Sequence, residues 1–145
     1  MESIRSFRGE NLFLSNFYRD RQPIFFNNKY YLTAEHAFQA SKATSEEARE
    51  YVASSPDART AQHRGREIAC RADWEKIKVQ VMASIVWEKF SENASLKQAL
   101  LNTGDAYLEE GNWWGDTFWG VCNGEGYNML GKILMAVRDA LRRQQ

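Results

Sequence analysis

One long amphipathic segment in the middle of the chain constrains the fold more than any other feature. Between residues 73 and 90, apolar side chains recur every three or four residues, at Trp74, Ile77, Val81, Ile85 and Val86. This is the period of an α-helix with one apolar stripe, and such a stripe must be buried against other elements. The sequence therefore predicts that this is the central helix of the core.

Extended patterns precede this helix. A short strand is expected around residues 4–7, and two aromatic-rich runs, 23–26 and 29–32, flank the pair Asn27 and Asn28. Because asparagine tolerates the positive φ angles of a tight turn, these runs predict a β-hairpin.

Three shorter helices are predicted between the hairpin and the central helix. Thr33 can cap the first, which runs to about Lys42. The second covers Glu46–Ala53, where Thr44 and Glu47 have the spacing of a capping box. The third starts at Pro56, since proline suits a first helical position.

Two helices are predicted after the central one. One covers about Ala94–Leu101 and stops at Gly104; the other starts near Asn128 and carries five apolar residues on one face (Leu130, Ile133, Leu134, Val137 and Leu141). At 145 residues the chain is long enough for one continuous core. We therefore predict an α+β, helix-rich single domain over residues 1–145.

Composition excludes several classes of function. Nineteen Lys and Arg balance nineteen Asp and Glu, so the chain lacks the basic charge that non-specific nucleic-acid binding requires. The two Cys and two His are far apart without metal-ligand spacing, so no metal site is expected. No other cofactor is expected either. No run is apolar enough for a membrane span or a signal peptide, which leads us to expect a cytoplasmic protein without a membrane partner.

Residues 103–127 form the most unusual stretch. They hold six of the nine Gly, six aromatics and five acidic residues, with no Lys or Arg. We predict a long, irregular, Gly-rich and aromatic loop before the last helix. Loops of this length are more often functional than not, so this loop is a candidate for part of the site. Its tryptophans either pack against the core or stack on a planar ligand, and Asp116 lies among them.

Two further segments carry candidate site residues. On a helix, Glu35, Gln39 and Lys42 fall on one polar line, which is either a solvated face or a carboxylate and an amine that converge on a ligand. His36 is adjacent to that line and is expected to be structural. The basic segment from Arg64 to Lys78 either recognises phosphate through forked guanidinium groups or holds surface arginines around a core tryptophan.

Taken together, six short pieces resemble the YbiA-like, or NADAR, superfamily. They are residues 14–17, 34–42, 65–66, 73–78 with Met82, 114–116, and 128–131 with 134–135 and Arg138. Their order and spacing extend the resemblance over nearly the whole chain. The chain departs from the bacterial YbiA type at residues 117–122. There it has an aromatic run, Thr117 to Cys122, in place of the Gly-rich and less aromatic run of that type, so the resemblance does not specify the substrate.

The resemblance implies an N-glycosidase with an α+β fold. Members of the family are associated with hydrolysis of phosphoribosyl-amine intermediates of riboflavin synthesis and with removal of ADP-ribose from guanine bases. The expected partner is therefore a small nucleotide or an ADP-ribosylated base, including a base carried by nucleic acid. The expected catalytic residues are Glu35, Lys42 and Asp116, and the expected substrate-binding residues are Asn16, Phe17, Gly65, Arg66, Trp74, Lys78, Trp114, Gly115, Trp119, Asn128 and Gly131.

Residue chemistry leaves two mechanisms open. Breaking a ribosyl C–N bond develops positive charge at the anomeric carbon, which Glu35 and Asp116 can stabilise while they activate water. Alternatively, Lys42 attacks that carbon and forms a Schiff base with the opened sugar. A competing function of a different class is a non-catalytic module that binds ADP-ribose or a related nucleotide. The oligomeric state stays open.

Overall fold

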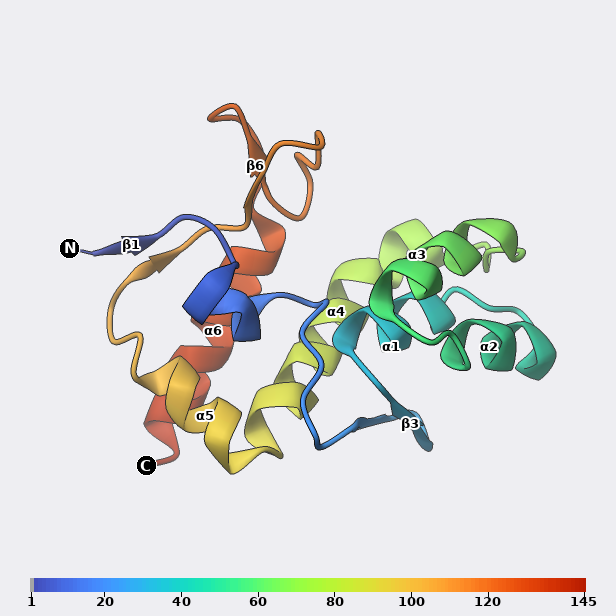
Figure 1. Ribbon diagram of the computed structural model, residues 1–145, viewed down its shortest axis with the longest axis horizontal. Helices are drawn as coiled ribbons and strands as arrows, with labels where there is room; N and C mark the ends of the chain where they lie inside the picture. Colours follow the sequence, from blue (N-terminus) through green and yellow to red (C-terminus); the bar gives the residue numbers. More distant parts are fainter. Residues whose placement is uncertain (1) are drawn as a thin grey trace. The chain divides into compact units, whose positions relative to one another are not determined.

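The computed structural model describes residues 2–145, about half of them helical, with three small two-stranded sheets within that range (Figure 1). This confirms the predicted α+β, helix-rich class. The chain divides into two compact units, residues 16–89 and residues 2–15 with 90–145. Within residues 2–145, every helix is too short or too polar to cross a bilayer.

The first unit begins with the predicted β-hairpin. Strand β2 (Ile24–Phe26) pairs antiparallel with β3 (Lys29–Tyr31), so that Ile24 lies opposite Tyr31. Asn27 and Asn28 have φ angles of 51° and 64°. Two successive residues with positive φ form the turn whose twist matches paired strands, which is why asparagine is suited to both positions.

Three short helices follow the hairpin: α1 (Ala34–Ala40), α2 (Glu46–Ala53) and α3 (Ala58–Glu67). The Thr33 hydroxyl accepts from the backbone N–H of His36, as expected of a cap. The other two caps differ from prediction, because Ser45 caps α2 and Asp57 caps α3. In both cases a side chain that can cap a helix lies nearer the helix start than Thr44 or Pro56. Its oxygen accepts from a free backbone N–H of the first turn.

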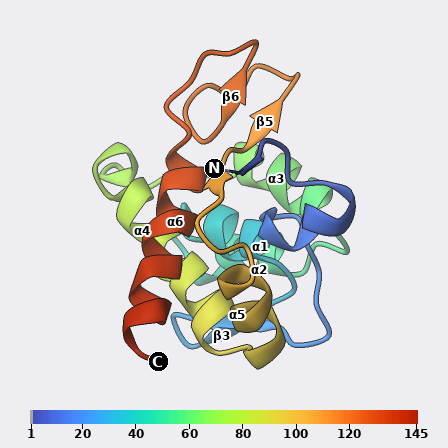
Figure 2. The same ribbon diagram turned by 90° about the vertical axis from the view of Figure 1, so that its left-hand side faces the viewer.

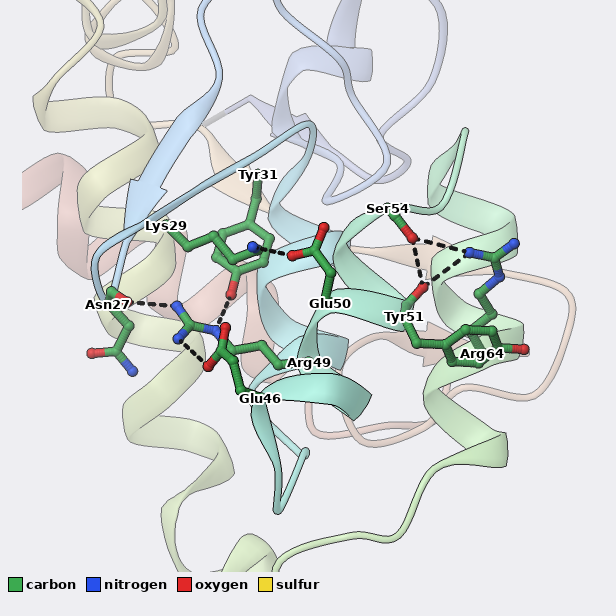
Figure 3. Close-up of polar contacts among 9 residues, drawn as sticks. All are labelled: Asn27, Lys29, Tyr31, Glu46, Arg49, Glu50, Tyr51, Ser54 and Arg64. Carbon is green, nitrogen blue, oxygen red and sulfur yellow. Dashed lines mark hydrogen bonds and ion pairs between the residues drawn. The ribbon is translucent and has the colours of Figure 1, made fainter.

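Polar contacts of α2 fix the hairpin and α3 (Figure 3). The Arg49 guanidinium donates to the Tyr31 hydroxyl (2.8 Å) and to the carbonyl oxygen of Asn27 (2.5 Å), and Lys29 forms an ion pair with Glu50. On the other side, Arg64 of α3 donates to the carbonyl oxygen of Tyr51 (2.9 Å). Helix α1 packs against both α2 and α3 and is buried along its whole length.

Helix α4 (Trp74–Ser91) confirms the predicted central helix. Its buried residues include Trp74, Ile85 and Val86, as expected, but Ile77 and Val81 are only half-buried. Met82 and Lys89 are buried instead. The buried face is therefore rotated relative to the predicted stripe, and it includes one charged residue.

The second unit joins the two ends of the chain. Strand β1 (Ser3–Ile4) pairs parallel with β4 (Tyr107–Leu108), so the first strand is shorter than predicted and starts one residue earlier. A 3₁₀ helix, η1 (Gly9–Leu14), follows. Helix α5 (Ala94–Leu101) has the predicted bounds, and α6 (Met129–Arg143) buries the predicted apolar face.

The loop before α6 contains more regular structure than predicted. Besides β4, strand β5 (Gly111–Asn112) pairs parallel with β6 (Val121–Cys122), and Figure 2 shows these two strands side by side. The prediction of a wholly irregular stretch was wrong because two-residue strands carry no hydrophobic period of their own.

Candidate active site

The first turn of α1 holds Glu35 against the segment that carries Asn16. The backbone N–H of Glu35 donates to the carbonyl oxygen of Asn16 (3.0 Å), and the Asn16 amide donates to Sδ of Met82 (3.3 Å). Asn16 and Glu35 are both buried, whereas Phe17 is 41% exposed. Two residues expected to share a site, Asn16 and Glu35, are thus brought together.

The first two residues of the polar line on α1, Glu35 and Gln39, are buried. Gln39 Nε2 donates to Glu35 Oε2 (2.7 Å), and each side chain is only 6% exposed. The interpretation of this line as a solvated face is therefore wrong for Glu35 and Gln39. A buried carboxylate with a fixed donor is the arrangement that a charge-stabilising group in an enzyme requires.

Lys42 lies just beyond the end of α1 and is half-buried. Its Nζ is 6.0 Å from the ring centroid of Trp74. Burial lowers the pKa of Lys42, and the positive charge of Arg66 lowers it further, while Glu35 and Cys70 act in the opposite direction. A lowered pKa gives Lys42 more neutral amine near pH 7 than an ordinary surface lysine has.

Trp74 begins α4 and is a core residue as well as a neighbour of Lys42. Its ring packs against Phe38 at a centroid distance of 5.0 Å, and it is 6% exposed. Lys78, one turn further on, forms an ion pair with Glu75 (2.7 Å). The indole therefore presents only a small part of its surface to any ligand.

Several basic side chains of this region are already engaged by other residues. Arg64 bonds to α2, and Arg71 holds Asp73 through two hydrogen bonds (2.6 and 3.0 Å). Arg66 differs, because it is exposed and makes no hydrogen bond or ion pair to any residue in the described part of the chain. Arg66 therefore has its whole guanidinium fork available to a phosphate.

In the second unit, Asp116 is held by hydrogen bonds to backbone groups. Its Oδ1 accepts from the N–H groups of Phe118 (3.2 Å) and Trp119 (3.0 Å). The side chain of Asn112 accepts from the Asp116 N–H (3.0 Å) and donates to the Asp116 carbonyl oxygen (2.9 Å). Asp116 is half-buried, and its orientation is fixed.

The tryptophans of the loop differ in exposure. Trp113 and Trp114 are 71% and 57% exposed and meet edge to face at 4.9 Å, next to Gly115 with φ of 87°. Trp119 is half-buried and packs edge-on against Phe118 at 4.8 Å. Packing therefore accounts for Trp119, whereas the first two rings leave much of their surface uncovered.

Asn128 and Gly131 join the loop to the start of α6. Asn128 has φ of 54° and does not cap the helix through its side chain. Its Oδ1 accepts from the Glu110 N–H (2.9 Å), and its Nδ2 donates to the Leu108 carbonyl (2.9 Å). A Cβ at Gly131 would overlap both that carbonyl and the Asn128 amide, so only glycine fits there.

The similarity to known proteins covers the same residues. A model of the NADAR domain matches residues 5–142, which include every candidate site residue above. The chain belongs to the NADAR domain family. This confirms the resemblance on which the site residues were chosen.

Relatives of this NADAR chain carry names of two kinds, N-glycosidase and riboflavin biosynthesis protein. An N-glycosidase of Nostoc punctiforme is 36% identical over 125 residues (82% of this chain, 80% of that protein), and the N-glycosidase YbiA of Escherichia coli strain K12 is 38% identical over 122 residues (82% and 76%). A riboflavin biosynthesis protein of Vibrio vulnificus is 41% identical over 133 residues, 90% of this chain and 35% of that protein. The solved NMR structure of the E. coli protein YbiA matches with a TM-score of 0.86 at 33% identity, covering 99% of this chain and 88% of that one.

His36 in this NADAR chain has a structural role, as expected. Its Nε2 donates to the carbonyl oxygen of Ser55 (2.9 Å), and its Nδ1 accepts from the Thr33 hydroxyl (2.8 Å). Burial lowers the pKa of His36, which keeps the ring neutral in this arrangement. The ring ties the cap of α1 to the chain after α2.

Sequence reasoning missed two neighbours of the candidate site. Gln39 was placed on the polar line without a role, although its spacing of four residues from Glu35 on a helix was the available signal. Cys70 is exposed and acts on Lys42 electrostatically, because residues 43 and 70 form an isolated β-bridge. No local pattern could have indicated that bridge.

Proposed function

We propose that this NADAR chain is an N-glycosidase that hydrolyses the N-glycosidic bond of a phosphorylated ribosyl substrate. The observation that carries the proposal is the half-buried amine of Lys42, whose pKa is lowered and which interacts electrostatically with the buried Glu35. A pure binding module has no need of an amine tuned in this way. The names of the Nostoc and E. coli relatives support the same reaction class.

In the proposed lysine route, neutral Nζ of Lys42 attacks the anomeric carbon. The C–N bond to the base breaks, its electron pair stays on the base, and the base takes up a proton. The C1–O4′ bond then breaks as the sugar ring opens, and the two protons of Nζ pass to the departing base and to the ring oxygen, which leaves a Schiff base between Lys42 and the sugar. Water then adds to the imine carbon and releases the sugar as an aldehyde together with the free amine. Glu35 is the group that carries protons through these steps.

The alternative route has no covalent intermediate. There, Glu35 and Asp116 supply the carboxylates: one activates water and the other stabilises the positive charge of the ribosyl group. Both side chains are held by hydrogen bonds, from Gln39 in the first case and from backbone N–H groups in the second.

Substrate recognition is part of the same proposal. Arg66, together with Lys78, binds phosphate, Asn16 binds sugar hydroxyls or base edges, and Trp114 contacts the base. Asn128 and Trp119 support the loop instead, because both ends of the Asn128 amide are bonded to backbone groups and the Trp119 ring packs on Phe118. The free guanidinium of Arg66 and the exposed ring of Trp114 support this assignment. We propose ADP-ribosylated guanine, free or in nucleic acid, and ribosylamine intermediates of riboflavin synthesis as substrates, the latter because of the Vibrio relative. We also propose a cytoplasmic location, where exposed thiols such as Cys70 stay reduced.

Turnover tests the proposal directly. The protein is incubated with ADP-ribosylated guanosine and, separately, with the ribosylamine intermediates, and release of free base or ribose phosphate is followed by chromatography. We expect turnover of at least one substrate, and a fall of about 10²–10³ in kcat for Glu35→Gln, because the amide keeps the shape and removes the charge.

Two outcomes would contradict the proposal. A folded Glu35→Gln variant that retains more than about a third of the activity would remove Glu35 from the reaction. Tight binding of ADP-ribose without release of any base would instead identify a nucleotide-binding module.

A further inference from the structure

The strongest unexplained feature of the described residues is the side chain of Gln39. One end of its amide is engaged, because Nε2 donates to Glu35 Oε2 (2.7 Å). The other end, Oε1, is buried and has no hydrogen-bond partner within residues 2–145. A buried carbonyl without a partner lowers the stability of the fold, so its retention calls for a reason other than stability.

Gly65 of α3 explains why the side chain stays in this orientation. A Cβ at position 65 would overlap Oε1, Cδ and Cβ of Gln39. Gly65 is buried, and α3 packs against α1 at this point. The absence of a side chain at Gly65 therefore makes the room in which the Gln39 amide lies.

We propose that Gln39 is a positioning residue for Glu35, and that Gly65 fixes the rotamer in which Gln39 does this. The inference rests on the proposed function, since it assigns a role towards a catalytic Glu35. An N–H donated to a carboxylate favours the charged form and limits its rotation, and both effects serve a group that must be an anion in one orientation. The unsatisfied oxygen is the cost of presenting the N–H end to Glu35.

Gln39→Met is the variant that tests this role. Methionine keeps the length and volume, removes the donor to Glu35 and also removes the buried oxygen without a partner. We expect a thermal midpoint near that of the wild type and a kcat lowered about tenfold or more, with KM changed less. The acid limb of the kcat/KM profile should move to higher pH, because the carboxylate loses a bond that favours its charged form.

Gln98→Met is the matched control. Gln98 lies on α5, in the unit that does not contain Glu35, and donates to Asn102 (2.8 Å) at the same spacing of four residues; neither is a candidate site residue. It should leave kcat and the pH profile unchanged. Gln39→Asn, which keeps the amide but is too short to reach Glu35, serves as the second variant if Gln39→Met does not fold.

The Glu35→Gln background separates this inference from the proposed function. If Gln39 acts through Glu35, adding Gln39→Met to Glu35→Gln changes kcat no further. A large loss from Glu35→Gln together with an unchanged kcat and pH profile for Gln39→Met would overturn the role of Gln39 alone. A Glu35→Gln variant that keeps its activity would overturn the proposed function itself.

Discussion

The helices around α1 and the loop before α6 hold their candidate site residues by different means. In the first region, every residue of α1 is buried, and Glu35 and Gln39 are fixed by helical spacing and by packing against α3. In the second, two asparagine side chains, Asn112 and Asn128, bind backbone groups of the loop, and two tryptophans remain exposed. Around α1, many packing contacts together hold the candidate site side chains in place. In the loop, a few hydrogen bonds hold them.

The largest expected effect is the loss of turnover in Lys42→Arg, and this variant tests which of the two regions performs the chemistry. Lys42→Arg keeps the positive charge but cannot act as an amine nucleophile, so in the lysine route turnover falls at least about 100-fold. Borohydride added during turnover should trap the reduced sugar on Lys42 of the wild type, detected by mass spectrometry, and should trap nothing on the variant. In this route activity rises as pH increases through the lowered pKa of Lys42, since only the neutral amine attacks.

The opposite result would shift the chemistry towards the loop. If Lys42→Arg turns over and no adduct forms, Lys42 is only an electrostatic contact. Asp116→Asn should then be the variant that abolishes activity together with Glu35→Gln, because the carboxylate pair must activate water.

The next effect concerns the stability of the helical region. Lys89 is 3% exposed, and burial lowers its pKa to about 7. Between pH 7 and about 10.4 the unfolded chain therefore keeps a proton on Lys89 that the native chain releases, so this group makes native stability rise with pH. Lys89→Met should raise the thermal midpoint most at or below pH 7, and the gain should shrink towards pH 10. A gain independent of pH would show that titration of Lys89 is not its cause.

Loss of one amide should be costly in the loop. Asn128→Ala removes the partner of the Glu110 N–H and of the Leu108 carbonyl, and we expect about 2–3 kcal/mol lower stability in urea unfolding. Asn93 offers the comparison, because its side chain caps α5 by accepting from the N–H of Leu96, and its replacement by alanine should cost about 1 kcal/mol. Equal losses for the two variants would show that the loop does not depend on Asn128.

The same contrast explains what could be predicted from the sequence. The hairpin, α4 and α5 have local signals: a pair of turn asparagines and an apolar period. Strand β4 lacks such a signal because its partner β1 lies at the other end of the chain. In the site, the bond from Gln39 to Glu35 follows from helical spacing, but the influence of Arg66 on Lys42 depends on how α3 packs, which no local pattern contains.

A smaller effect concerns substrate binding by the helical region. Arg66→Ala should raise KM for phosphorylated substrates about five- to tenfold and change kcat less, because a phosphate contact is present in both the ground and the transition state. Arg71→Ala is the control, since Arg71 is already engaged by Asp73 and should leave KM unchanged. A common rise in KM for both variants would indicate general loss of positive charge in place of a specific contact.

The smallest effect is expected at the exposed end of the loop. Trp113 is 71% exposed, and its main described contacts are the edge of Trp114 and the guanidinium of Arg8, whose Cζ lies 3.9 Å from the ring centroid. An exposed cation–π contact contributes about 0.5–1 kcal/mol, so Trp113→Ala should lower stability by no more than this and leave KM unchanged. Trp119→Ala removes a half-buried ring that packs on Phe118 and should cost more. If Trp113→Ala instead raises KM while unfolding is unaffected, the exposed rings contact the substrate, and the loop serves binding more than its own packing.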